Sequence, residues 1–120
     1  MKMAKIIIVD DSRILRKILN GTLTEAGHEI IGEAGNGEEV LKLLETATPD
    51  LITLDITMPV MDGLAALKNI KEKYPSIKVV MVSAAGQKNK VMEALKAGAS
   101  DFLQKPFEPE DVKRVVSKLV

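Results

Sequence analysis

The chain has 120 residues, and its 17 basic and 17 acidic residues give a formal net charge of zero. This length suits one domain with a hydrophobic core, and the balanced charge argues against direct nucleic-acid binding or a polybasic membrane surface. The lack of cysteine excludes disulfides, thiolate metal sites and a cysteine nucleophile. No apolar run is long enough for a signal peptide or a membrane span, so we expect a cytoplasmic protein without membrane insertion.

Short apolar runs alternate five times with segments of helical periodicity. In chain order we predict a strand at 6–9, a helix at 13–26, a strand at 29–34, a helix ending near 46, a strand at 51–54, a helix at 62–74, a strand at 78–82, a helix at 87–97, a strand at 101–104 and a helix at 109–119. The strands are short and rich in β-branched residues, which is typical of buried strands.

Helix boundaries and faces follow from capping residues and apolar spacing. Ser12 is a good N-cap for the first helix, and Gly27 is a natural stop. The apolar stripe predicted for this helix consists of Ile14, Leu15, Ile18, Thr22 and Ala26. In the helix at 87–97 we expect Val91, Met92 and Leu95 to point inward. His28 follows a helix-ending glycine without an obvious partner, so we expect a solvated loop histidine.

Alternating strands and helices predict an α/β fold of five βα units, with a doubly wound parallel sheet and helices on both faces. If the strand order is 2-1-3-4-5, the first and third strands are neighbours. The carboxyl ends of all five strands then lie along one edge of the sheet. In open α/β sheets, ligands bind at that edge.

Polar and charged side chains stand at four of these strand ends. Asp10 and Asp11 follow the first strand, Asp55 the third, Ser83 the fourth and Lys105 the fifth. Three carboxylates at one edge repel each other, and a hard divalent cation such as Mg²⁺ would offset this repulsion. Lys105 would offset part of the charge before a metal binds.

These groups suit phosphoryl transfer onto a carboxylate. We assign Asp55 as the nucleophile, Asp11 as a direct metal ligand and Asp10 as a ligand through water. Ser83 Oγ and Lys105 Nζ would hold phosphoryl oxygens, where positioning and electrostatics do most of the catalytic work.

Together these segments resemble the receiver domains of two-component response regulators, over nearly the whole chain. The motifs that carry the resemblance are Asp10-Asp11, Leu54-Asp55-Ile56-Thr57-Met58-Pro59, Asp62-Gly63, Val82-Ser83-Ala84 and Lys105-Pro106-Phe107. The resemblance implies a flavodoxin-like (βα)5 fold with strand order 2-1-3-4-5 and a phosphoacceptor at Asp55. It implies Mg²⁺ held by Asp11, Asp55 and the main-chain carbonyl of Thr57. It also implies a cis peptide bond between Lys105 and Pro106.

The same resemblance implies partners and an output. The phosphodonor would be a phosphohistidine of a sensor histidine kinase. Within the family the chain resembles single-domain, CheY-like chemotaxis regulators. This resemblance implies that residues 1–120 form one receiver domain without an effector domain. It further implies a monomer whose downstream target is a protein such as the flagellar motor switch. A phosphorelay intermediate, or a domain excised from a longer regulator, fits nearly as well.

In the family, phosphorylation moves the hydroxyl of Ser83 toward the phosphoryl group, and the aromatic at the position of Phe102 turns inward. Here that aromatic is phenylalanine, so the coupling would rest on packing alone. Thr57 and Ala85 stand where some members carry an amide and an acid beside the acyl phosphate. We therefore expect slower phosphoryl loss than in those members.

Three alternative functions fit the sequence less well. A receiver-like adaptor could bind partners without being phosphorylated, but the acidic set is complete and is joined by Ser83 and Lys105. A Mg²⁺-dependent phosphatase with an aspartyl nucleophile usually carries a second acid two residues later, where Thr57 stands. A flavin-binding protein of this fold needs a phosphate loop after the first strand, where Asp10 and Asp11 would repel a phosphate.

Overall fold

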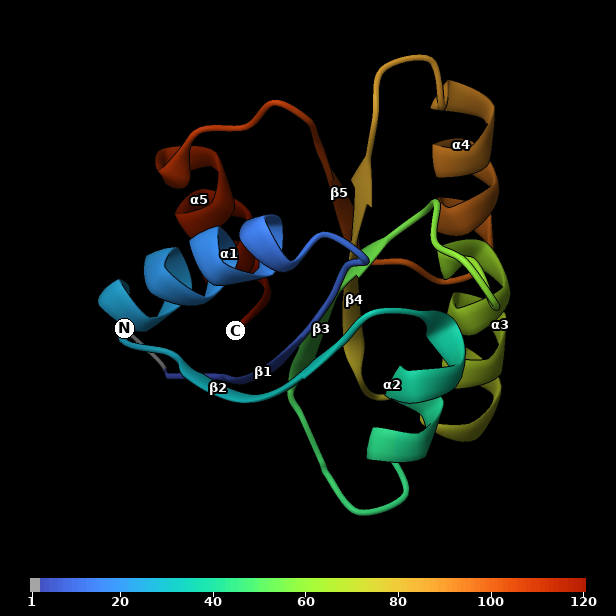
Figure 1. Cartoon of the computed structure of the whole chain (residues 1–120), viewed down its shortest axis with the longest axis horizontal. Helices are drawn as coiled ribbons and strands as arrows, with labels where there is room; N and C mark the ends of the chain where they lie inside the picture. Colours follow the sequence, from blue (N-terminus) through green and yellow to red (C-terminus); the bar gives the residue numbers. More distant parts are fainter. Residues whose placement is uncertain (1–2) are drawn as a thin grey trace.

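The computed structural model describes residues 3–120, in which five strands and five helices alternate (Figure 1). The elements are β1 (Lys5–Val9), α1 (Arg13–Glu25), β2 (Glu29–Ala34), α2 (Gly37–Leu43), β3 (Leu51–Asp55), α3 (Gly63–Lys73), β4 (Lys78–Ser83), α4 (Lys88–Lys96), β5 (Asp101–Gln104) and α5 (Pro109–Leu119). Within residues 3–120, no helix has the length and apolar composition needed to cross a membrane.

Most predicted boundaries agree with the structure to within one residue, and the main exception is the end of α2. This helix ends at Leu43 rather than near residue 46. The backbone N–H groups of Glu45 and Thr46 donate to the carbonyls of Lys42 and Leu43, three residues back. The chain therefore tightens into turns after Leu43, as often happens at helix ends.

The five strands form one parallel sheet in the order β2-β1-β3-β4-β5, which confirms the predicted topology. β3 lies at its centre, and Asp55 at the end of β3 is paired in register with Val82 of β4. The carboxyl ends of β1, β3, β4 and β5 therefore meet at one edge of the sheet, where each strand leads into a connection to the next helix.

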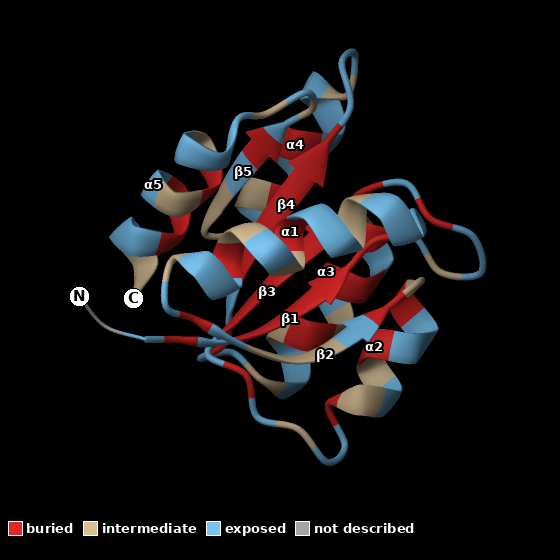
Figure 2. Ribbon diagram, turned by 60° about the vertical axis from the view of Figure 1, so that its left-hand side comes forward, coloured by how far each residue is buried: buried red, intermediate tan, exposed pale blue. Residues whose placement is uncertain are grey.

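The sheet separates two hydrophobic cores, because alternate side chains of a strand point to opposite faces. In β1, Ile6 and Ile8 pack with α1 and α5, whereas Ile7 and Val9 pack with α2, α3 and α4. We call these the α1/α5 core and the α2–α4 core; Figure 1 shows the two helix layers on opposite faces. Figure 2 shows the buried strands between helices whose outer faces are exposed.

Two predicted helix faces were partly wrong. In α1, Leu19 and Leu23 are buried, whereas Ile14 is 75% exposed and Ile18 is about half exposed. The predicted stripe and the buried leucines both fit a period of 3.6 residues. Contact with β1 and α5 decides that the face carrying Leu19 and Leu23 is the buried one. In α4, Met92 is 49% exposed rather than inward, because Val91 and Ala94 occupy the inner face.

The interpretation of His28 as a solvated loop residue was also wrong. Gly27, at φ 96°, ends α1 and turns the chain into β2. This turn brings His28 beneath the start of β1, where its Nδ1 accepts the backbone N–H of Ala4 at 3.0 Å and only 6% of the residue is exposed. Burial lowers the pKa of His28, which favours the neutral ring that this hydrogen bond requires.

Candidate functional site

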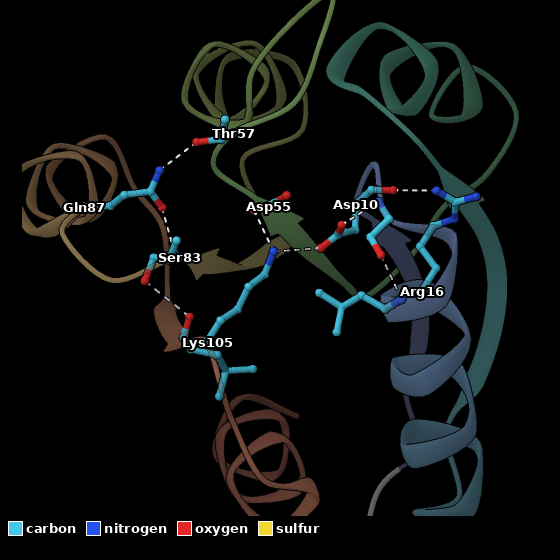
Figure 3. A network of polar contacts seen from close by, with 11 residues as sticks. Asp10, Arg16, Asp55, Thr57, Ser83, Gln87 and Lys105 are labelled. Atoms are coloured by element: carbon cyan, nitrogen blue, oxygen red, sulfur yellow. Dashed lines mark hydrogen bonds and ion pairs between the residues drawn. The ribbon is translucent and has the colours of Figure 1, made fainter.

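Three carboxylates converge at the carboxyl ends of β1 and β3. Asp10 and Asp11 follow β1, Asp55 ends β3, and one oxygen from each lies within 4.8 Å of the others. Asp10 and Asp55 are buried, whereas Asp11 is exposed at the mouth of the cluster. The predicted order of strands thus brings together residues 45 positions apart, as Figure 3 shows for Asp10 and Asp55.

Lys105 is the cation of this cluster. It stands just after β5, and its Nζ lies 3.5 Å from Asp10 Oδ2 and 3.5 Å from Asp55 Oδ1 (Figure 3). The peptide bond from Lys105 to Pro106 is cis, as the resemblance implies. One ammonium facing two buried carboxylates leaves the cluster short of positive charge.

The shortage of positive charge appears in the protonation of Asp55. Burial, with a further contribution from the Asp10 carboxylate, raises the pKa of Asp55 from 3.8 to about 6, although Lys105 opposes the change. Asp10 Oδ2 is buried without a hydrogen-bond partner in the described chain, since Lys105 lies at ion-pair rather than hydrogen-bond distance. Unpartnered buried anionic oxygen is costly, and a cation in the cluster would relieve that cost.

The loop after β1 is held by its own residues and by α1. Asp10 Oδ1 accepts the backbone N–H of Ser12 at 2.8 Å, and Ser12 Oγ caps α1 by accepting the N–H of Leu15. Arg16 donates through Nη1 to the main-chain oxygen of Asp10 at 2.6 Å and through Nε to Glu33 at 3.1 Å. Sequence reasoning missed Arg16, because nothing in the α1 pattern indicates that its side chain turns back toward the loop.

The loop after β3 is shaped by a capped helix start and a close backbone approach. Asp62 caps α3 by accepting the N–H of Ala65, and Gly63 donates its N–H to Ile56 at 2.7 Å. A Cβ on Gly63 would clash with the main-chain oxygen of Asp55, so only glycine fits here. Asp62-Gly63 thus fixes how the chain leaves the phosphoacceptor candidate.

Ser83 and Thr57 flank the cluster without joining it. Ser83 is buried at the end of β4, and its Oγ donates to the main-chain oxygen of Leu103 at a long 3.4 Å. The hydroxyl of Thr57 instead accepts a hydrogen bond from Gln87 Nε2 at 2.6 Å. Gln87 is a second residue that sequence reasoning missed, because its role depends on two loops meeting in space.

Phe102 lies apart from the acidic cluster, on β5 beside α4. It is 39% exposed and lines a cavity of about 310 Å³ whose walls include Ser83, Gln87, Met92 and Leu95. The cavity therefore lies between α4 and β5 and reaches the end of β4, and its lining is mostly apolar.

This arrangement has two chemical capacities. The clustered oxygens of Asp10, Asp11 and Asp55 fit a hard divalent cation, since such ions take oxygen ligands and the cluster has an unpartnered buried oxygen. The Asp55 carboxylate, at the centre of the edge, is placed to act as a nucleophile beside the ammonium of Lys105.

Comparison with known proteins agrees with this geometry. A family model described as the response regulator receiver domain matches residues 6–117. Chemotaxis protein CheY of Thermotoga maritima is 44% identical over 115 residues, which cover 96% of this chain and 96% of that protein.

Solved structures give the same result. A chain of the CheX-CheY-BeF3-Mg+2 complex from Borrelia burgdorferi matches with a TM-score of 0.88 and 38% identity, covering 95% of this chain and 87% of that one. NtrX from Brucella abortus matches with a TM-score of 0.92 and 33% identity over 98% of this chain. The match spans only 27% of the NtrX chain.

Proposed function

The chain belongs to the response regulator receiver domains, and we propose that Asp55 accepts a phosphoryl group from the phosphohistidine of a sensor histidine kinase. Receiver domains of this family take part in phosphorylation-dependent signalling. The observation that carries the proposal is the convergence of Asp10, Asp11 and Asp55 within 4.8 Å of one another, with Lys105 against two of them.

In the transfer step, an oxygen of Asp55 forms a bond to phosphorus as the donor's nitrogen–phosphorus bond breaks. The leaving imidazole keeps the electron pair of that bond and takes up a proton. A pKa of about 6 leaves Asp55 mostly ionised at neutral pH, so its carboxylate can attack. The protein thus assists its own phosphorylation by positioning and charge, without being an enzyme that acts on other substrates.

The residues present fit a Mg²⁺ ion. Asp11 and Asp55 would bind it directly together with the main-chain carbonyl of Thr57, and Asp10 would bind it through water. When bound, Mg²⁺ supplies positive charge against the phosphoryl oxygens. Asp11 is exposed, so an ion can reach the cluster from solvent. Asp10 Oδ2 is buried without a hydrogen-bond partner in residues 3–120, so a bound cation would offset the cost of burying its charge.

Two further side chains would hold the transferred group. Lys105 Nζ, 3.5 Å from Asp55 Oδ1, would contact a phosphoryl oxygen as a point charge. Ser83 Oγ has only a long hydrogen bond to give up, so turning toward the phosphoryl group costs it little. Ser83 ends β4, the neighbour of β3, and Lys105 follows β5 on the far side of β4 and reaches Asp55 with its long side chain.

The output would be a change in the surface formed by α4 and β5. As Ser83 moves, it vacates one wall of the 310 Å³ cavity, and the ring of Phe102 can turn inward to fill the space. Phenylalanine has no hydroxyl, so packing alone couples ring and site. Met92 and Phe102 are both exposed in the resting state, and their rearrangement would change what a protein partner meets.

Chemotaxis is the pathway that we propose, with the flagellar motor switch as a target and a cytoplasmic location. The likeness to Thermotoga maritima CheY over 96% of both chains supports this choice. The Borrelia burgdorferi complex adds a second kind of partner, a CheX-like protein. Similarity to NtrX, a much longer chain, favours a phosphorelay or a role within another regulator as the second candidate.

A direct test is phosphorylation by a small acyl phosphate with Mg²⁺, followed by intact and peptide mass analysis. We expect one phosphoryl group on the parent, located at Asp55, and none on Asp55→Asn. Glu72→Gln removes the same single negative charge at an exposed site on α3, and this control should be phosphorylated like the parent. A parent that never carries the adduct with either acyl phosphate or a phosphorylated kinase would contradict the proposal. Steady release of phosphate without an adduct would indicate a phosphatase instead.

A further inference from the structure

The carboxamide of Gln87 joins the two loops that border the acidic cluster. Its Nε2 donates to Thr57 Oγ1 at 2.6 Å, and its Oε1 accepts the backbone N–H of Ala84 at 2.7 Å. Thr57 belongs to the loop between β3 and α3, and Ala84 begins the loop between β4 and α4. Figure 3 shows the carboxamide of Gln87 between Thr57 and the chain next to Ser83.

Gln87 stands where its side chain could cap α4, but it does not do so. It is the N-cap residue of α4, but its side chain makes no capping hydrogen bond. It is partly buried, whereas Ala84, Ala85 and Gly86 before it are exposed. The side chain therefore serves the contact between loops rather than the start of its own helix.

The bridge uses the backbone N–H of Ala84, a donor at the same edge of the sheet as the proposed phosphoacceptor. Asp55 pairs in register with Val82, and the N–H of Ile56 donates to the carbonyl of Val82, so Ala84 lies just past that level on the neighbouring strand. A phosphoryl group on Asp55 would bring several strong, charged acceptor oxygens to this edge. Charge-assisted hydrogen bonds are about twice as strong as neutral ones, so such oxygens would compete for the Ala84 N–H.

The bridge also restrains the residue after Ser83. Ser83 Oγ must leave the main-chain oxygen of Leu103 to approach Asp55. Gln87 holds the next residue, Ala84, at one end and Thr57 at the other, so any movement of Ser83 that carries its main chain toward β3 requires these hydrogen bonds to rearrange.

We propose that Gln87 is a positioning residue, a latch between the two loops that stabilises the resting state and that phosphorylation of Asp55 must open. This inference rests on the proposed function and adds its regulation. The latch opposes the active conformation, so breaking it should favour that conformation. A side chain that merely supported the structure would have the opposite effect, since its loss would weaken binding at the site.

Gln87→Met tests the latch, because methionine has similar length but no strong donor or acceptor. The first measurement is amide hydrogen exchange in metal-free protein, where loss of the acceptor should speed exchange of the Ala84 N–H. The second is binding of beryllofluoride, a phosphoryl mimic, with Mg²⁺. We expect the variant to bind more tightly by roughly three- to tenfold, the equivalent of one ordinary hydrogen bond.

Two more variants make the test specific. Thr57→Val removes the hydroxyl acceptor but keeps the main-chain carbonyl, and the double variant should bind no more tightly than Gln87→Met alone. Asn89→Ala, at an exposed position in the first turn of α4, should leave both measurements at parent values. Unfolding midpoints measured in parallel separate the latch from general loosening.

The outcomes separate this inference from the function on which it rests. Unchanged or weaker beryllofluoride binding by Gln87→Met would overturn the latch, and so would unchanged exchange of the Ala84 N–H. Failure of the parent itself to bind beryllofluoride would count against phosphorylation at Asp55. Since a latch without a phosphoryl group to open it has no role, that result would overturn the inference as well.

Discussion

Asp55→Asn should stabilise the metal-free protein at neutral pH. In the folded chain the Asp55 carboxylate is buried, faces Asp10 and Asp11, and shares Lys105 with Asp10. Asparagine keeps the shape of this side chain and removes its charge. Lys105 retains Asp10 as its partner, so the substitution relieves repulsion without leaving the ammonium unpaired.

The raised pKa sets the size and the sign of the effect. The difference between 3.8 in the unfolded chain and about 6 in the folded one corresponds to roughly 3 kcal/mol of unfolding free energy. Water reaches the cluster through exposed Asp11, so we expect a measured gain of about 1 to 2 kcal/mol. Between these pKa values the folded state binds the extra proton. The parent therefore loses stability relative to the variant as pH rises from about 4 to 7.

Urea unfolding with a chelator, from pH 4 to 8, measures this directly. The difference between Asp55→Asn and the parent should be smallest near pH 4 and reach its full value near pH 7. Glu72→Gln, exposed on α3, should show no such rise. If the difference were the same at pH 4 and pH 7, or if the variant were the less stable at pH 7, burial and repulsion would not govern this carboxylate.

Three other substitutions have defined outcomes. His28→Asn keeps an acceptor for the Ala4 N–H but cannot titrate. Because the pKa of His28 is lowered in the folded chain, the parent should lose stability relative to this variant as pH falls below about 6.5. The same pH dependence of the unfolding free energy in both proteins would contradict this. Val60 is 76% exposed at φ 67°, so Val60→Asn should raise the unfolding free energy by about 1 kcal/mol, whereas Val60→Ile should not. Ala85→Glu should accelerate loss of the phosphoryl group, followed by release of label; an unchanged rate would exclude a role for this position in phosphoryl lifetime.

Much of the site could be predicted because its residues stand at strand ends. Four of the five apolar runs, all but that of β2, lead into a charged or hydroxyl residue, and parallel topology brings those residues to one edge. Asp10, Asp11, Asp55 and Lys105 thus meet as predicted, and their spacing in sequence is irrelevant once the strand order is known. Their proposed chemical roles stay predictions.

The features that could not be predicted depend on contacts between segments that are distant in the sequence or on the path of a loop. Ile14 and Leu15 belong to overlapping stripes, and periodicity does not decide which stripe faces the sheet. The burial of His28 depends on a main-chain donor 24 residues away. The contacts of Arg16 and Gln87 similarly depend on how a loop curves next to the end of a strand.

The two apolar cores divide the pocket in a way that bears on its evolution. Asp10 and Lys105 stand on connections that run into α1 and α5, whereas Thr57 and Gln87 stand on connections that run into α3 and α4. The proposed metal site draws on both sides of the sheet, because Asp10 and Asp11 precede α1 whereas Asp55 and Thr57 precede α3. We therefore expect mutations that repack either core to alter ion affinity, whereas only those in the α2–α4 core act directly on the two loops that Gln87 joins.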